Sequence, residues 1–425
     1  MIQSYVDADQ FMGAVLVVKD GQIVLDKGYG FADRDAKTPI TPDTRFYIAS
    51  VTKQFTATSI LLLEERGKLS TDDPVGKYLP GLPAAWNSVP LKNLLTHTSG
   101  IPDWGNQPQA RAASRQPITA GQMLAYVSDK PLDFPTDTAY AYSNTNYVLL
   151  AMVVEKVSGK PFGTFLQANI FKPLKMEATR YNVPLTGLKG YVSRPGGLDV
   201  EIPPVLDHTS SLGDSGISTT THDLLKWQQG LDGGKLLKPA SLTRMTTAYK
   251  NDRGVNGNNG FGVVIRAPRG EFRRIEHGGT IPGFSANLAW YPDLRLSVII
   301  LENVEPRQPA PSPGEMRNNL VAVMSGKDAP APVVHKEVPI NTAVLPDYPG
   351  TYELSPSRTI VITLEGTQLF AESPGQWRLP VFPEAENRFF AKALEVQFEF
   401  VRGADGKVAS MILHQSGRQT PGTRR

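Results

Sequence analysis

Strand-like segments stand at both ends of residues 1–326, and this placement constrains the fold more than any other feature of the sequence. Near the start, Ala14–Val18 and Ile23–Leu25 flank an Asp-Gly dipeptide, which is typical of a tight hairpin turn. Near the end, Phe284–Tyr291 pairs naturally with Leu296–Leu301 across a Pro-Asp turn. Because helical patterns fill the middle, we predict an α+β domain in which a helical region packs against an antiparallel sheet.

The longest helical pattern runs from Ser50 to Gly67 and is mostly apolar, so it predicts a buried helix that ends at the glycine. The predicted helix His222–Gln229 follows capping hydroxyls, and a further strand is predicted at Gly260–Arg266. The other predicted helices are Thr119–Ser128, Asn144–Ser158 and His222–Gln229.

A proline-rich stretch, Lys327–Pro346, holds four prolines and little periodicity, which is typical of a linker. Beyond it, strand-like runs at Thr359–Leu364, Gln368–Glu372 and Leu394–Val401 alternate with glycine-marked turns. We therefore predict a domain at residues 1–326, a linker at 327–346 and a small antiparallel barrel or sandwich at 347–425. We expect this last domain to modulate specificity or assembly, because the motifs described below all lie before it.

Charge and composition exclude several classes of function. The 425 residues include 44 Lys and Arg against 41 Asp and Glu, with no basic run suited to a phosphate backbone, so we expect no nucleic-acid partner. No apolar stretch approaches the roughly 18 residues of a membrane span, and residues 2–10 lack the pattern of a signal peptide. The absence of cysteine excludes disulfides, thiolate metal sites and a cysteine nucleophile. Covalent catalysis would need Ser, Thr, Lys or a carboxylate.

A Ser-Val-Thr-Lys sequence opens the predicted buried helix and places the Ser50 hydroxyl and the Lys53 amine on one helix face. A desolvated lysine can accept the proton of such a serine, and the unpaired amides of the first helical turn favour an oxyanion. The motif is weak by itself. A capping serine followed by a solvated lysine is the competing interpretation.

Two later motifs offer complementary chemistry. In Tyr142-Ser143-Asn144, the tyrosine could move a proton and the asparagine amide could hold a substrate carbonyl. In the sequence His-Gly-Gly-Thr at 277–280, the glycines would allow close approach of a substrate, and a backbone amide could be a second oxyanion donor. Each has a structural alternative, a half-buried tyrosine beside a helix cap or a histidine in a hairpin turn. A second Tyr-x-Asn at 249–251 is predicted to be a turn, and His97 a structural hydrogen-bonding residue.

Taken together and in this order, the three motifs resemble those of the serine β-lactamase and penicillin-binding-protein superfamily, in the branch of class C β-lactamases, DD-peptidases, D-aminopeptidases and family VIII esterases. Two loops are similar to signatures of that branch: Leu-Leu-Thr-His-Thr-Ser-Gly-Ile-Pro-Asp at 94–103 and Gly-Asp-Ser-Gly-Ile-Ser-Thr at 213–219. The resemblance covers residues 10–326. It also favours a periplasmic or secreted location, with a cytoplasmic one as the alternative.

The resemblance implies roles for seven residues. Ser50 would be the acylated nucleophile, Lys53 and Tyr142 the proton-transfer pair, and Asn144 the amide that orients the substrate. The backbone amides of Ser50 and Thr280 would form the oxyanion hole, with Gly279 beside them and His277 facing the same cleft. The sequence departs from the pattern at His277, since most class C β-lactamases have Lys-Thr-Gly there, and the change weakens the anchoring of a substrate carboxylate.

The resulting prediction is a serine hydrolase that forms an acyl-enzyme on Ser50, with no metal or cofactor. The expected substrate is a small molecule or short peptide, either a D-amino-acid peptide or amide or a simple carboxylic ester. β-Lactamase activity is the next alternative. A penicillin-recognising protein with slow turnover is another, although such a protein has no need of both proton-transfer groups.

Overall fold

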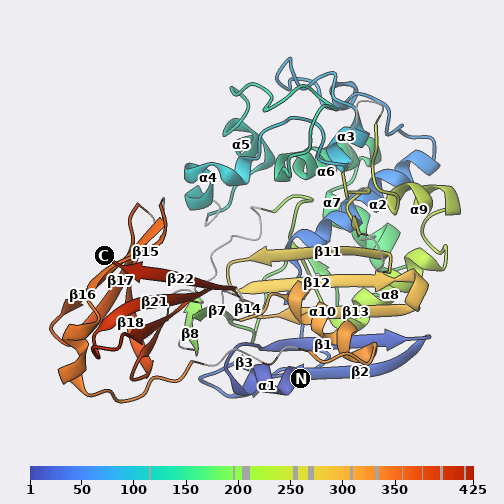
Figure 1. Ribbon diagram of the computed structural model, residues 1–425. Helices are drawn as coiled ribbons and strands as arrows, with labels where there is room; N and C mark the ends of the chain where they lie inside the picture. The colour runs from blue at the N-terminus through green and yellow to red at the C-terminus, as the bar shows by residue number, and fades with distance from the viewer. Residues whose placement is uncertain are drawn as a thin grey trace.

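The computed structural model describes residues 1–113, 116–194, 197–202, 211–251, 257–266, 272–306, 310–329, 331, 335–356, 358–375, 377–392, 396–415 and 418–425. A helical region lies over one face of a large sheet, and a β-barrel stands beside that sheet (Figure 1). This arrangement confirms the predicted α+β fold class and the predicted C-terminal antiparallel barrel. Among the described residues, no helix combines the length and apolar character that crossing a membrane requires.

The large sheet has six strands in the order β10-β11-β12-β13-β1-β2. Each neighbouring pair is antiparallel, including the predicted hairpin and the predicted pairing of the last two long strands. Asp20 and Gly21, at the hairpin turn, both have the positive φ angles that such a turn requires. The strands are β1 (Gly13–Lys19), β2 (Gln22–Tyr29), β10 (Val264–Arg266), β11 (Arg274–Ile281), β12 (Phe284–Tyr291) and β13 (Leu296–Glu302).

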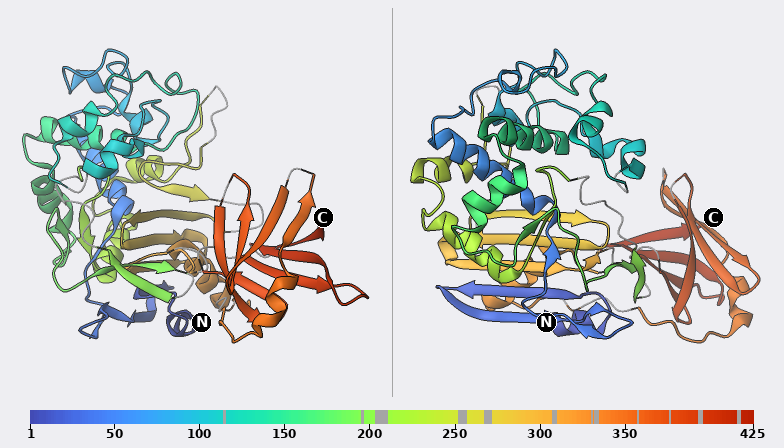
Figure 2. Two further views of the ribbon diagram at one scale, coloured as in Figure 1. Left: turned by 90° about the vertical axis from the view of Figure 1, so that its left-hand side faces the viewer. Right: turned by 180° about the vertical axis from the view of Figure 1, so that it is seen from behind.

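Both faces of this sheet are covered, which explains why β1, β12 and β13 are buried with no alternation between buried and exposed positions. On one face, Leu16 and Ile299 join the core under the helical region. On the other, Val17 and Ile300 pack against α1 (Ile2–Asp7) and α10 (Pro313–Met324). Figure 2 shows the sheet between these two layers in both views.

The helical region is built around α2 and α6, which pack against each other. The helix α6 begins at Asn144 and ends at Ser158, as predicted, because Gly159 takes the left-handed conformation that ends helices. The helices are α2 (Thr52–Glu65), α3 (Leu91–Leu95), α4 (Pro108–Ala113), α5 (Ala120–Ala125), α6 (Asn144–Ser158), α7 (Phe162–Leu166), α8 (Thr221–Asp232) and α9 (Pro239–Met245).

Short elements connect these layers. The 3₁₀ segments are η1 (Ala49–Val51), η2 (Val75–Lys77), η3 (Trp104–Asn106) and η6 (Pro292–Leu294), and η4 (Gln167–Phe171) is a π-helical turn. Three small sheets, β14-β7-β8, β3-β4 and β5-β9-β6, complete this part of the chain. Their strands are β3 (Phe31–Asp33), β4 (Thr38–Pro39), β5 (Phe46–Tyr47), β6 (Arg180–Tyr181), β7 (Gly190–Arg194), β8 (Gly197–Ile202), β9 (Ile217–Thr219) and β14 (Val304–Glu305).

The C-terminal strands β15 to β22 form a closed barrel, in which β15 pairs with β22. Closure leaves no unpaired edge among the described strands of the barrel, and alternating side chains such as Val396, Phe398 and Phe400 fill the interior. The strands are β15 (Gly350–Ser355), β16 (Arg358–Glu365), β17 (Gln368–Ser373), β18 (Trp377–Ala385), β19 (Arg388–Ala391), β20 (Val396–Arg402), β21 (Val408–Gln415) and β22 (Arg418–Arg424).

Some predicted bounds were wrong. The strand predicted at Gly260–Arg266 begins only at Val264, because Gly262 has a φ of +71° and lies against the backbone of α2. The stretch predicted as a linker includes a 3₁₀ helix, η7 (Thr342–Asp347), whose Leu345 packs into the barrel core, while residues 330 and 332–334 of it lie outside the described residues. The domain boundaries at 326 and 347 stay predictions.

Candidate active site

Ser50 lies in η1, at the start of the buried helix α2. The residue before it, Ala49, has a φ of +45°, a conformation that costs a non-glycine residue energy and that clusters at functional sites. Among the residues that the structure describes, no side chain caps η1 or α2, so the interpretation of Ser50 as a capping serine is wrong. Ser50 instead lines a cavity of about 670 Å³.

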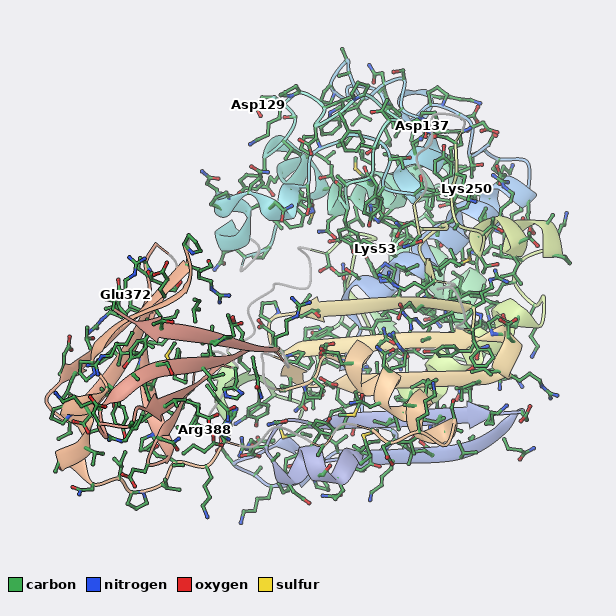
Figure 3. The ribbon with its side chains drawn as sticks, in the orientation of Figure 1. Lys53, Asp129, Asp137, Lys250, Glu372 and Arg388 are labelled. Atoms are coloured by element: carbon green, nitrogen blue, oxygen red, sulfur yellow. The ribbon has the colours of Figure 1, made fainter. Side chains whose placement is uncertain are left out.

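Lys53 is fully buried, with an exposed fraction of 0%, so the interpretation as a solvated lysine is also wrong. Its Nζ atom lies 3.0 Å from Ser50 Oγ, 2.8 Å from Asn144 Oδ1 and 2.9 Å from the carbonyl oxygen of Asp214. An ammonium group has three N–H donors, and these three oxygens accept all of them. Figure 3 shows Lys53 at the junction of the helical region and the sheet.

Tyr142 donates a hydrogen bond from its hydroxyl to Ser50 Oγ over 2.9 Å. Its ring lies 4.4 Å from the ring of His97, centroid to centroid, and Lys53 Nζ lies 5.0 Å from the Tyr142 ring centroid. His97 in turn accepts a hydrogen bond at Nδ1 from the backbone amide of Ser143. Burial and the positive charge of Lys53 hold the pKa of His97 well below its usual value, so a neutral imidazole supports the tyrosine.

Asn144 begins α6, and a carboxylate that sequence reasoning missed holds its amide in place. Asp103 accepts hydrogen bonds from the backbone amide of Asn144 (2.9 Å), from Asn144 Nδ2 (3.2 Å) and from the amide of Gly105 (3.2 Å). Because Nδ2 is turned toward the carboxylate, Oδ1 faces Lys53. Asp103 belongs to the predicted loop signature, but a loop aspartate has no periodic pattern that would mark this role.

Asp214 is the second carboxylate near Lys53 that sequence reasoning missed. Its side chain is buried, and its Oδ1 atom has no hydrogen-bond partner among the described residues. Burial raises the pKa of Asp214 to about 6, although the positive charge of Lys53 acts in the opposite direction. The buried ammonium of Lys53 therefore shares its surroundings with two carboxyl groups, neither of which is in direct contact with it in the described structure.

Gly279 brings β11 against the nucleophile. A Cβ atom at this position would lie 2.3 Å from the carbonyl oxygen of Ile48 and 2.8 Å from the amide nitrogen of Ser50. Only glycine permits this approach, which places the start of Thr280 beside the Ser50 amide. Both Gly279 and Thr280 line the same cavity as Ser50.

His277 also lines this cavity and is buried. Burial, together with the positive charge of Lys53, lowers its pKa to about 4, so the ring is neutral at pH 7. Its Nδ1 atom lies 2.6 Å from the carbonyl oxygen of Gly278 and must be the donor, since a carbonyl cannot donate. The Nε2 atom is left as an acceptor, which suits a substrate N–H rather than a carboxylate.

All seven residues predicted for the site therefore meet in one place. Hydrogen bonds connect Ser50 with Lys53 and Tyr142, and Lys53 with Asn144. The other three line the cavity into which Ser50 opens: His277, Gly279 and Thr280.

Comparison with known proteins identifies the family. The β-lactamase family profile matches residues 1–322, and residues 334–424 match a domain of unknown function, DUF3471. The chain belongs to the β-lactamase family. This result confirms the resemblance seen in the three motifs.

The relatives of the chain include penicillin-binding proteins and D-aminopeptidases. Penicillin-binding protein 4* of Bacillus subtilis is 32% identical, over 98% of this chain and 95% of its own length. A D-aminopeptidase of Gluconobacter oxydans is 27% identical, over 68% of this chain and 55% of its own length. The octameric penicillin-binding protein homologue from Pyrococcus abyssi has a similar fold, with a TM-score of 0.68 and 23% identity, covering 99% of this chain and 98% of that one.

Proposed function

We propose that this protein is a serine hydrolase that transfers the acyl group of an amide or ester to Ser50 and then to water. The observation that carries the proposal is the position of Ser50 Oγ, 3.0 Å from Lys53 Nζ and 2.9 Å from the hydroxyl of Tyr142. A serine within hydrogen-bond reach of two proton-transfer groups, at the wall of a cavity, is the arrangement that an activated nucleophile needs.

The first half of the reaction is acylation. As Ser50 Oγ forms a bond to the substrate carbonyl carbon, its proton passes to the pair of Lys53 and Tyr142. In the resting geometry both groups donate toward Ser50 Oγ, so attack requires that one of them has released a proton. The same pair then returns a proton to the leaving nitrogen or oxygen as its bond to the carbonyl carbon breaks.

The carbonyl oxygen becomes negatively charged during attack and needs donors. We assign this role to the backbone amides of Ser50 and Thr280, which the close contact at Gly279 brings together. The positive end of the α2 dipole and the nearby charge of Lys53 also favour a negative oxygen there. In the second half of the reaction, water forms a bond to the acyl carbon and gives a proton to the same pair. The bond between that carbon and Ser50 Oγ then breaks, and the pair returns the proton to Ser50 Oγ.

D-amino-acid amides or short peptides, and simple esters, are the substrates that we propose. The similarity to a D-aminopeptidase supports the first class, and the neutral His277, with an acceptor nitrogen at the cavity, suits a substrate that presents an N–H group. A second candidate function is the recognition or slow hydrolysis of β-lactams, which the similarity to a penicillin-binding protein along nearly the whole chain favours.

Intact-mass spectrometry tests the proposal directly. The protein is incubated with a fluorophosphonate and, separately, with a penicillin, beside the Ser50→Ala variant as the control. We expect one stable fluorophosphonate adduct, absent from the variant, and at most a transient penicillin adduct. A persistent penicillin adduct would favour the second candidate function. Labelling that survives in Ser50→Ala would show that another residue is the nucleophile, and the proposal would be wrong.

A further inference from the structure

Three arginines from separate elements meet in the cavity that contains Ser50. They are Arg266 of β10, Arg274 of β11 and Arg317 of α10, and all three line the cavity. The side chain of Arg317 is 5% exposed, whereas that of Arg266 is 48% exposed. None of them belongs to the machinery of acyl transfer described above, so their concentration in this cavity calls for a separate explanation.

One carboxylate, that of Glu276, lies at the centre of the cluster. Arg317 donates to it from Nη1, Arg274 Nε lies 3.0 Å from it, and Arg266 Nε lies 3.5 Å from it. Two neutral side chains complete the contacts of Arg317, namely Asn287, which accepts from Nη1 over 3.0 Å, and Asn318, which accepts from Nη2 over 2.9 Å.

The charges in this cluster do not balance. Three arginines and one glutamate are the charged residues among those described as lining the cavity, which leaves a surplus of two positive charges at pH 7. Burial and the positive charges of Arg274 and Arg266 lower the pKa of Arg317 to about 9. Arg317, the most buried of the three, is paired with Glu276, so the surplus charge lies on Arg274 and on the more exposed Arg266, at the side of the cavity. The surplus can be offset by an anion that enters from the cavity.

The strand β11 gives the distance of this cluster from the nucleophile. Gly279 lies against the Ser50 amide, and Glu276 is three residues away along the same strand. At about 3.3 Å per residue, the backbone of Glu276 lies roughly 10 Å along β11 from that of Gly279, and this sets the scale of the distance between the cluster and the carbonyl that Ser50 would attack. Arg274, Glu276 and Gly278 share one side of the strand, whereas His277 and Gly279 point to the other.

We propose that Arg266, Arg274 and Arg317 form a binding site for a carboxylate of the substrate, so that the preferred substrates are amides or esters with an anionic group about 10 Å from the scissile carbonyl. The guanidinium group matches a carboxylate because its donors form a planar fork. In an extended peptide this distance corresponds to about three residues. The inference rests on the proposed function, since it specifies the substrate class of the same site.

The test compares matched substrates. The first pair consists of 4-nitrophenyl esters with a dipeptide acyl chain, which is capped by a succinyl group or by its carboxamide. The second pair releases a dipeptide instead of 4-nitrophenol, and this leaving group ends in a carboxylate or a carboxamide. We expect one pair to show a kcat/KM about tenfold higher for the carboxylate at low ionic strength, the range of a charge-assisted hydrogen bond. The preference should decline in 1 M salt, where the Debye length is about 3 Å. It should also decline when the spacer is removed.

Substitution of the arginines tests whether the preference for the carboxylate substrate depends on the arginine cluster. In Arg266→Gln and Arg317→Gln the ratio of the two kcat/KM values should fall toward one. In Arg295→Gln, an exposed arginine between β12 and β13 that does not line the cavity, it should remain as in the wild type. Because the ratio does not depend on the concentration of active enzyme, partial misfolding does not change it. Should Arg317→Gln fail to fold, the more exposed Arg266 still provides the measurement.

The outcomes separate the two proposals. Ser50-dependent hydrolysis of the esters with equal rates for carboxylate and carboxamide would overturn the carboxylate site and leave the serine hydrolase intact. A preference that persists in both arginine variants would place the anion elsewhere and would also overturn it. If no ester is hydrolysed and no fluorophosphonate adduct forms, the proposed function fails. Calorimetric titration of Ser50→Ala with the succinyl dipeptide and its carboxamide then tests the site without turnover, and equal affinities would refute it.

Discussion

Replacement of Gly279 by alanine would test the geometry of the site at its tightest contact. The added methyl carbon would lie 2.3 Å from the carbonyl oxygen of Ile48, where ordinary contact begins at 3.4 Å, and 2.8 Å from the Ser50 amide nitrogen. Since the nearest atoms are backbone, β11 and η1 must separate by about 1 Å, and a displacement of this size costs about a hundredfold in rate. Loss of one oxyanion donor costs about a hundredfold to a thousandfold. We therefore expect the rate of acylation to fall by about a hundredfold to a thousandfold.

The assay is the second-order rate of fluorophosphonate labelling, with circular dichroism to verify the fold, because overpacking costs only about 1–3 kcal/mol of stability. Gly278→Ala is the matched control, since its methyl group would meet its nearest neighbours, Ala286 and Asn287, at 3.7 Å. It should retain the labelling rate to within about threefold, as expected for an ordinary contact. A folded Gly279→Ala protein that labels as fast as the control would refute the assignment of this contact to the oxyanion site.

The other predictions concern the groups around Lys53. Lys53→Met and Tyr142→Phe should each lower the labelling rate by about two to four orders of magnitude, and the double variant should lose little more, because the two residues form one proton-transfer unit; independent, multiplying losses would contradict this. Asp103→Asn should slow labelling by about tenfold to a hundredfold while the fold is retained, because the asparagine amide that it holds would turn away from Lys53. Unaltered labelling kinetics would show that this amide needs no such support. Asp214 has a pKa raised from 3.8 to about 6, so the folded protein binds a proton more tightly than the unfolded chain. Its contribution to stability is therefore lost as the pH rises between these values, by about 3 kcal/mol, and Asp214→Asn should weaken the decline in Tm between pH 4 and pH 7. An identical decline in both proteins would count against a buried carboxyl at this position.

Local signals in the sequence predicted the helices and strands best where they were complete. The helix Asn144–Ser158 has a polar start and a glycine stop, and its bounds were predicted to the residue. The strand predicted at Gly260–Arg266 was too long, because the positive φ of Gly262 results from contact with α2, and a contact between distant segments leaves no local pattern. The helix predicted at Thr119–Ser128 was also too long, since α5 ends at Ala125.

In the candidate site, too, local signals were predicted and contacts between distant segments were missed. Ser50 and Lys53 could be paired from their spacing on one helix, and the order of the motifs brought Tyr142 into the group through a family resemblance. Asp103 and Asp214 were missed because each lies in a loop and its hydrogen-bond partner, the Asn144 amide or Lys53 Nζ, is more than 40 residues away in the chain. The three arginines around Glu276 were missed for a related reason, because in the sequence each looks like an ordinary surface arginine.

The distribution of positive charge around Ser50 has a consequence for how this chain recognises substrates. A lysine in place of His277 would put a second ammonium in a place where burial, together with the charge of Lys53, already lowers the pKa of the imidazole to about 4. The neutral ring avoids this repulsion and leaves Lys53 as the cation nearest to the nucleophile among the described residues that form the site. The arginine cluster lies at a distance along β11 where it can attract an anion without acting on the proton-transfer pair at close range. Proton transfer and charge recognition thus depend on different residues, so that substitution of the arginines can change substrate preference while the activation of Ser50 is preserved.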